Sequence, residues 1–237
     1  MQVRRAVVLA AGNGDRFLGS STPSKLLAPV AGMPLISRTL LTAARAGIQL
    51  IDVILGYQSG AVRQAALSGA PADVMLRFHQ NDRWHEENGV SALVSRPHVG
   101  DERFALLMGD HIFNWQVLAR LLDHPAQPDE SLLAIDRGPA SAVRALEATR
   151  VRLDGDRITA IGKRLEPFDA LDTGVFVFAP SIFAALEESV ADGDTSLSGG
   201  VRRLAARGLM RGIETDGSAW CDVDTMDDLL EAAALFT

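Results

Sequence analysis

A glycine-rich segment with basic residues follows the first apolar stretch of the chain. It covers residues 9–17, and Lys25 comes shortly after it. Gly12 and Gly14 would let backbone N–H groups approach a polyphosphate closely, and Arg16 and Lys25 could neutralise its charge. The third small residue of a dinucleotide-binding loop is missing, and so is the Lys-Ser/Thr pair of a nucleoside-triphosphatase loop. The pattern therefore predicts a phosphate cradle of another kind.

Two aspartates in separate motifs could hold a hard cation. Asp110 follows the apolar run Phe104–Met108, and Asp224 lies in segment 220–225. Magnesium prefers one or two carboxylates, with phosphate oxygens and water completing an octahedron, so this pair would suffice. Each acid could instead cap a helix. Asp222 could also bind the metal, or it could contact a residue that binds the metal, because alternate residues of a strand point to opposite faces.

Other polar residues could bind the organic parts of a substrate. Asn88 could be a helix N-cap, but its amide can also donate to and accept from a pyrimidine edge. Lys163 could clamp a phosphate or simply be solvated. The five histidines show no tight metal-ligand spacing, so we do not expect zinc, although His111 adjoins Asp110. The lone Cys221 is expected to be a buried apolar residue.

Short apolar runs alternate with helical stretches in the first part of the chain. The predicted strands cover residues 3–9, 51–55, 74–78, 104–108 and 132–135, and the predicted helices cover 35–46, 60–68, 90–96 and 115–122. This alternation predicts an α/β fold with a mostly parallel sheet between helices. Ligands of such sheets bind beyond the carboxyl ends of the strands, which here places Leu9 and Met108 beside the site.

The pattern changes in the last third of the chain. We expect a hairpin over residues 151–161, a strand over 173–178, and helices over 180–189 and 226–235. No repeat or linker is visible. We expect one domain over residues 1–237, with a nucleotide-binding part over about 1–140 and an acceptor-binding part with a small hairpin lobe over about 141–237.

Composition narrows the class of protein. Hydrophobic residues make up 47% and charged residues 22%, which is typical of a globular chain. The net charge of −7 and the lack of a basic run argue against nucleic-acid binding. No apolar run is long enough for a membrane span, and the start does not resemble a signal peptide, so we expect a cytoplasmic protein without membrane insertion.

Taken together, the glycine loop, Gly109-Asp110 and segment 220–225 resemble the sugar-phosphate and alcohol-phosphate nucleotidyltransferase superfamily. The resemblance implies a Rossmann-like fold with a mixed, mostly parallel sheet. It implies that Arg16 and Lys25 act on the triphosphate and that Mg²⁺ is the cofactor, held by Asp110 and Asp224. The nucleotide-binding residues that it implies are Leu9, Ala10, Ala11, Gly12, Asn13, Gly14, Arg16, Lys25, Asn88, Gly89 and Ser91.

Within the superfamily, the chain most resembles inositol-1-phosphate cytidylyltransferases. The similar stretches are residues 88–93, 103–111, 161–163, 168–174 and 220–225. This resemblance implies that Lys163, Asp172 and Thr173 bind the acceptor. Some relatives are fused to a membrane-embedded phosphotransferase that consumes the CDP-alcohol, so a separate enzyme of that kind is the expected downstream partner.

The reaction implied is attack by an acceptor phosphate oxygen on the α-phosphorus of CTP, with pyrophosphate leaving. Positioning and charge neutralisation carry such a transfer. Alternatives are a sugar-1-phosphate enzyme using UTP or dTTP and a phosphocholine or phosphonate cytidylyltransferase. A non-catalytic regulatory relative is a different class, and it would be expected to have lost Lys25, Asp110 or Asp224, which are all present.

Overall fold

The structure is a computed structural model that describes residues 3–14, 17, 24–138 and 148–236. Within these ranges, no helix combines the length and the apolar character needed to cross a lipid bilayer.

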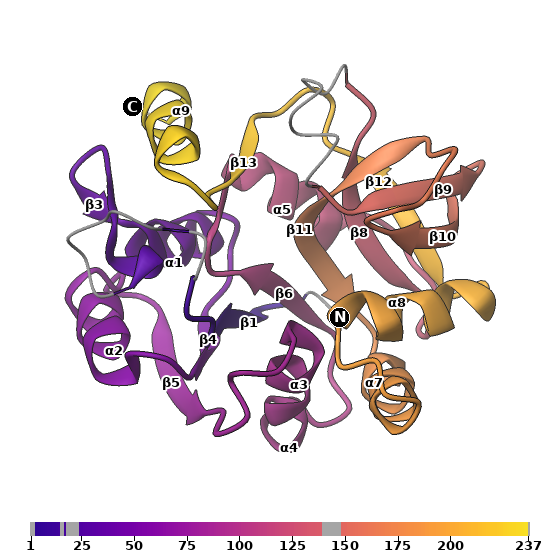
Figure 1. The fold of residues 1–237 in the computed structure, drawn as a ribbon, viewed down its shortest axis with the longest axis horizontal. Coiled ribbons are helices and arrows are strands. Elements are labelled where there is room, and N and C mark those ends of the chain that lie inside the picture. The colour runs from indigo at the N-terminus through magenta and orange to yellow at the C-terminus, as the bar shows by residue number, and fades with distance from the viewer. Residues whose placement is uncertain (1–2, 15–16, 18–23, 139–147, 237) are drawn as a thin grey trace.

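A mixed nine-stranded sheet forms the centre of the described chain (Figure 1). β11 and β10 run opposite to the other strands, which share one direction. In spatial order the strands are β5 (Met75–Gln80), β4 (Leu50–Leu55), β1 (Arg5–Ala10), β6 (Phe104–Met108), β11 (Ala170–Phe178), β8 (Ser131–Asp136), β12 (Met210–Glu214), β10 (Arg157–Gly162) and β9 (Arg150–Asp154). The predicted α/β fold with a mixed sheet between helices is confirmed, and four of the eight neighbouring pairs in this order are parallel.

The central strands are buried on both faces, as their continuous apolar sequences indicate. In β1, Ala6, Val8 and Ala10 join one hydrophobic core, and Val7 and Leu9 join the other. All five side chains are less than a tenth exposed. The five strands predicted in the first part of the chain correspond to β1, β4, β5, β6 and β8.

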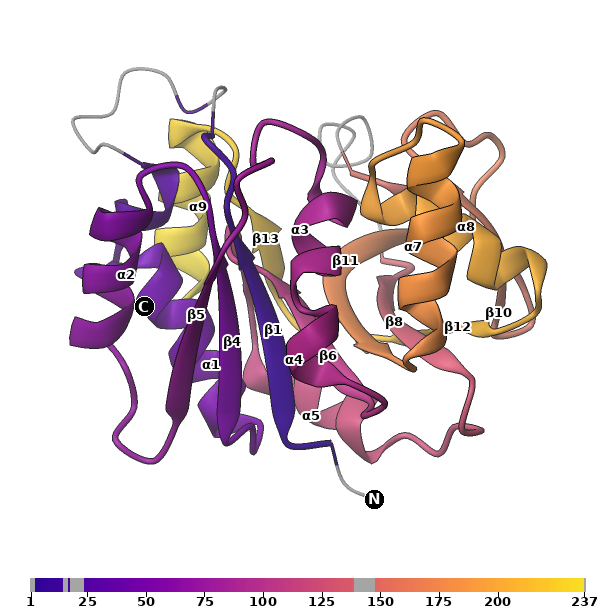
Figure 2. The same cartoon turned by 90° about the horizontal axis from the view of Figure 1, so that it is seen from below.

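Helices cover the two faces of the sheet, and Figure 2 shows α1 and α2 on one side and α7 and α8 on the other. The first core receives α1 (Leu35–Arg45), α2 (Ser59–Ser68), α5 (Trp115–Asp123) and α9 (Met226–Leu235). The second core receives α3 (Asn88–Val94), α4 (Arg96–Val99), α7 (Ser181–Ala191) and α8 (Leu197–Ala206). The predicted helices correspond to α1, α2, α3, α5, α7 and α9, whereas α8 and β12 were not predicted.

The predicted hairpin lobe is continuous with the main sheet. Its strands β9 and β10 pair with each other, β10 also pairs with β12, and β9 pairs back onto the start of β11. Five strands thus close into a ring from β11 through β8, β12, β10 and β9. This closure places the first residues of β11 beside the hairpin.

Two short ladders and a 3₁₀ helix lie outside the main sheet. β13 (Trp220–Asp222) pairs antiparallel with β7 (His111–Phe113), and β2 (Pro29–Val30) pairs with β3 (Met33–Pro34). A 3₁₀ helix, η1 (Lys25–Leu27), precedes β2. The β7–β13 ladder brings Asp222 opposite His111. It therefore joins the two acidic motifs that lie far apart in the sequence.

Candidate active site

Two cavities open at one edge of the sheet. β1, β4, β5 and β6 all end there, and β11, which runs the other way, begins there. One cavity, of about 330 Å³, is lined by the glycine loop and Lys25, and we call it the nucleotide cavity. The other, of about 470 Å³, is lined by Lys163 and Asp172, and we call it the acceptor cavity. They share the four residues Asn88, Met108, Asp110 and Asp224, so they meet at the end of β6.

The glycine loop forms one wall of the nucleotide cavity. Leu9, Ala10, Ala11, Gly12, Asn13 and Gly14 all line it. Gly14 has φ of +65°, a conformation that favours glycine, and Phe17 N donates to its carbonyl at 2.8 Å. A Cβ on Gly12 would meet nothing within 4 Å, so its backbone is open to a ligand. Arg16, expected at the triphosphate, lies outside the described residues.

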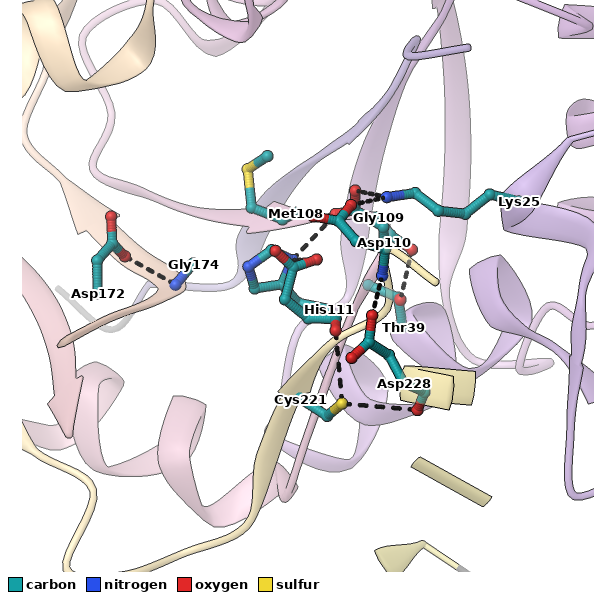
Figure 3. Close-up of polar contacts among 12 residues, drawn as sticks. Lys25, Thr39, Met108, Gly109, Asp110, His111, Asp172, Gly174, Cys221 and Asp228 are labelled. Atoms are coloured by element: carbon teal, nitrogen blue, oxygen red, sulfur yellow. Dashed lines mark hydrogen bonds and ion pairs between the residues drawn. The ribbon is translucent and has the colours of Figure 1, made fainter. Parts of the chain in front are cut away.

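Lys25 stands between the two predicted metal-binding acids. It begins η1, and the hydroxyl of Ser24 accepts a hydrogen bond from Leu26 N at this turn. The buried Lys25 Nζ lies 2.7 Å from Asp110 Oδ2 and 2.7 Å from Asp224 Oδ1. Figure 3 shows Lys25 reaching Asp110 from one side, with His111 on the other.

The end of β6 holds Asp110 rigidly. Gly109 N donates to Leu9 O at 2.9 Å, and a Cβ on Gly109 would lie only 2.7 Å from the same oxygen. Only glycine permits this approach of β6 to β1. On the other side, Asp110 O accepts a hydrogen bond from Val223 N at 3.1 Å. The carboxylate of Asp110 is thus fixed relative to both the glycine loop and segment 220–225.

Neither acid is a helix cap. Asn114 is the N-cap residue of α5, and Thr225 caps α9 in a capping box with Asp228. Asp224 instead pairs with Lys25. The alternative in which capping explains both aspartates therefore does not hold.

The charged groups around Asp110 stabilise one another in their ionised forms. Burial opposes ionisation of Asp110, but Lys25 and His111 outweigh it and hold its pKa well below the usual range. Burial would lower the pKa of Lys25, yet Asp110 and Asp224 raise it above its ordinary value. His111 is likewise raised to a pKa of about 9, because Asp222 and Asp110 outweigh the effect of burial. Burial raises the pKa of Asp222 to about 6.

The residues at this position fit a divalent cation. Asp110, His111 and Asp222 each offer a ligand atom, and these atoms lie within 4.8 Å of one another. Asp222 Oδ1 is buried and has no hydrogen-bond partner in the described part of the chain. It lies 3.5 Å from His111 Nδ1. Two carboxylates suit magnesium, which prefers oxygen ligands. Asp222 is therefore a candidate oxygen ligand beside Asp110, and the assignment of Asp224 to the metal stays a prediction.

Of the residues predicted to bind the nucleoside, Asn88 and Ser91 line the nucleotide cavity, but their side chains already make hydrogen bonds within the protein. Ser91 lines the nucleotide cavity, and its hydroxyl accepts a hydrogen bond from Asn81 Nδ2 at 2.9 Å. Asn88 Oδ1 already accepts from Leu197 N at 2.8 Å, so its amide ties α3 to α8. Gly89 lets α3 approach Thr195, since a Cβ would lie 2.6 Å from Thr195 O. Gly89 therefore has a packing role. The amide of Asn88 is already used in a hydrogen bond within the protein.

On the acceptor side, two of the three predicted residues line the cavity. Lys163 is exposed on the turn after β10, and Asp172 lies in β11. Asp172 Oδ1 accepts from Gly174 N at 2.8 Å, and burial raises the pKa of Asp172 to about 6. The Thr173 hydroxyl is fully buried and donates to Ala134 O at 2.8 Å. Thr173 was predicted to bind the acceptor, but its side chain does not line the acceptor cavity. It points to the face opposite Asp172, because neighbouring residues of a strand point to opposite faces.

Several lining residues were missed by the sequence analysis. Trp84 and Glu86 line the nucleotide cavity, whereas Asp227, Asp228 and Glu231 of α9 line the acceptor cavity. Trp84 and Glu86 belong to the connection that follows β5. Because ligands bind beyond the carboxyl ends of parallel strands, the position of this connection after a predicted strand could have indicated them.

Comparison with known proteins agrees with this fold. Residues 6–209 match the model of the MobA-like NTP transferase domain. A "Bifunctional IPC transferase and DIPP synthase" of Rubrobacter xylanophilus is 35% identical over 94% of this chain and 50% of the relative. Its counterpart from Archaeoglobus fulgidus is 34% identical over 98% of this chain and 44% of the relative. The chain thus spans about half the length of these curated relatives.

A third relative and a solved structure extend the comparison. The "CMP-5'-(3-aminopropyl)phosphonate synthase" of Streptomyces rubellomurinus is 36% identical over 65% of this chain and 23% of the relative. The inositol-1-phosphate CTP transferase of T. maritima superposes with a TM-score of 0.85 at 22% identity, covering 99% of this chain and 97% of that one, which shows a common fold. With the family model matching most of its length, the chain belongs to the MobA-like NTP transferase domain family.

Proposed function

We propose that the chain is a magnesium-dependent cytidylyltransferase that joins CMP from CTP to a small phosphorylated alcohol and releases pyrophosphate. The observation that carries the proposal is the meeting of the two cavities at Asp110, with Lys25 on the nucleotide side and Lys163 on the far side. A triphosphate on the glycine loop and a phosphate near Lys163 would face each other there.

The residues on the nucleotide side bind and polarise the triphosphate. Backbone N–H groups of the glycine loop and the ammonium of Lys25 are positioned for phosphate oxygens. Asp110 and Asp222 would hold magnesium, which would neutralise phosphate charge when bound. Lys25 keeps its proton, so it can stabilise the negative charge that develops on the departing pyrophosphate.

Inositol-1-phosphate is the acceptor that we favour. Two relatives are named IPC transferases, and this chain is similar to them over almost its whole length. Several carboxylates line the acceptor cavity, and a carboxylate accepts hydrogen bonds from the hydroxyl groups of a polyol. Lys163 is the sole Lys or Arg among the described residues of that lining, which suits one phosphate.

An aminoalkylphosphonate is the second candidate acceptor. The relative named for an aminopropylphosphonate product is 36% identical over 156 residues, and the same carboxylates would pair with an ammonium group. The two candidates differ in charge at the end remote from phosphorus.

Measuring pyrophosphate release tests the proposal. The nucleotides are CTP, UTP, dTTP, ATP and GTP, and each is combined with inositol-1-phosphate, glucose-1-phosphate, phosphocholine and 3-aminopropylphosphonate. We expect CTP with inositol-1-phosphate to give the highest kcat/KM. CTP with the phosphonate as best acceptor would keep the reaction class and discard inositol. No release with any pair would refute nucleotidyl transfer.

A further inference from the structure

The nucleotide cavity has two chemically different ends. Its loop wall runs from Ala11 to Gly14, and an added Cβ on Gly14 would lie 3.0 Å from Lys25 Cβ. At the other end of the wall, an added Cβ on Gly56 would lie 2.4 Å from Trp84 Cβ and 2.6 Å from Ala11 O. Lys25 therefore marks the phosphate end, and Trp84 marks the opposite end, where the base must lie.

The connection after β5 gives this end a rigid shape. Asn81 Oδ1 accepts from Arg83 N at 2.9 Å, Glu86 N donates to Arg83 O at 3.0 Å, and Asn81 Nδ2 reaches Ser91. Trp84 packs beside Tyr57, with ring centroids 5.4 Å apart. These contacts hold Trp84 and Ser91, which both line the nucleotide cavity.

Glu86 also lines the nucleotide cavity and is oriented by Arg83. The guanidinium holds the carboxylate in a bidentate pair, with Nε 2.6 Å from Oε1 and Nη2 2.7 Å from Oε2. Each carboxylate oxygen has lone pairs left after this pairing. The hydrogen bonds from Arg83 also hold the pKa of Glu86 below its ordinary value, so the group only accepts.

A fixed acceptor distinguishes two bases of the same size. Cytosine carries an exocyclic amino group, which donates, where uracil carries a carbonyl oxygen, which accepts. A carboxylate is the usual partner of that amino group, and it repels the carbonyl. Asn88 Oδ1 already accepts a hydrogen bond from Leu197 N, which leaves it one lone pair and fixes its direction.

We propose that Glu86, held in place by Arg83, accepts a hydrogen bond from the exocyclic amino group of the base and thereby selects CTP over UTP. The inference rests on the proposed cytidylyltransferase function. Trp84 supplies an apolar surface for the ring, without a preference between the two bases.

Direct binding tests this inference apart from turnover. Dissociation constants for CTP and UTP are measured by calorimetry on the full chain without acceptor. We expect the wild type to bind CTP at least about tenfold more tightly, which is about 1.4 kcal/mol. Glu86→Gln, which can also donate, should bring the two constants to within about threefold. Arg83→Met should lower the ratio too, and Trp84→Leu should weaken both nucleotides equally.

The control is Glu87→Gln, because Glu87 is the next residue, is exposed and lines neither cavity. It should leave the CTP to UTP ratio unchanged. A wild-type ratio in Glu86→Gln, or no preference for CTP in the wild type, would overturn the inference. If CMP is transferred but the ratio of the CTP and UTP dissociation constants is the same in Glu86→Gln as in the wild type, the proposed function stands and the role of Glu86 is refuted. If Glu86 selects CTP but no pyrophosphate is released, the role of Glu86 stands and the proposed function is refuted.

Discussion

At the scale of single residues, Lys25 is the centre of the charge arrangement. Its ammonium contacts Asp110 and Asp224 at equal distances, so one positive charge is shared between two carboxylates. In the proposed reaction, a triphosphate on the glycine loop would compete with these carboxylates for the same ammonium. Asp222 lies on the other side of Asp110, where His111 is its charged neighbour. The two acids of segment 220–225 therefore have different charged neighbours.

Substituting the two acids separately should reveal this difference. We expect Asp222→Asn to raise the magnesium concentration for half-maximal turnover at least about tenfold, because it removes the negative charge of one of the two proposed carboxylate ligands. Asp224→Asn should lower turnover through Lys25 but change that concentration by less than about threefold. Turnover measured against magnesium concentration decides this, with thermal unfolding as a control for folding. A raised requirement in Asp224→Asn alone would restore Asp224 as the ligand.

The role of Lys25 in the chemical step can be tested by kinetics. Lys25→Ala should lower kcat at least about tenfold, a loss of about 1.4 kcal/mol of transition-state stabilisation. The physical reason is that the charge of the leaving pyrophosphate grows as the bond breaks, so its partner matters most then. Steady-state kinetics over both substrates measure it. A raised KM for the acceptor with unchanged kcat would place Lys25 outside the triphosphate site.

At the scale of elements, periodicity predicted the strands and helices whose apolar faces are continuous. It missed β7 and β13, which have three residues each and acquire strand geometry only by pairing with each other. α8 was missed because two glycines, Gly199 and Gly200, interrupt its helical pattern. They are needed there, since a Cβ on Gly200 would lie 2.6 Å from a Leu186 methyl group of α7.

The irregularity in β11 controls the position of His111. Gly174 has φ of +75°, its register with β8 shifts here, and an added Cβ would lie 2.5 Å from His111 Cδ2. Gly174→Ala should therefore lower the free energy of unfolding by about 1–3 kcal/mol and reduce turnover. Urea unfolding and initial rates measure both effects.

Gly155→Ala is the matched control for Gly174→Ala. Gly155 also has a positive φ, of +62°, but it lies at the tip of the β9–β10 hairpin with nothing within 4 Å of an added Cβ. We expect a loss of stability of about 1–2 kcal/mol from backbone strain with wild-type turnover. Equal losses of turnover in both variants would show that strain alone, and not the contact with His111, is responsible.

At the scale of the whole molecule, the sequence predicted which segments meet but not which atoms are free. The glycine loop and Gly109-Asp110 were recognisable because they follow predicted strands whose ends collect at one edge, whereas segment 220–225 was recognised from the family resemblance. The commitments of Asn88 to Leu197 and of Thr173 to Ala134 depend on the packing of distant segments. Trp84 and Glu86 carry no local motif, so only the folded chain brings them to the cavity.

The division of the site between two cavities predicts that acceptor and nucleotide binding can be changed separately. Lys163 comes from the hairpin lobe and lines only the acceptor cavity, whereas Lys25 lines only the nucleotide cavity. A charge-assisted hydrogen bond to phosphate contributes about 1.5–3 kcal/mol, so Lys163→Ala should raise the acceptor KM about tenfold or more. The Kd for CTP should stay within about twofold of wild type. Calorimetry with CTP and steady-state kinetics with the acceptor measure the two quantities, and a weakened CTP affinity in Lys163→Ala would show that one continuous site binds both.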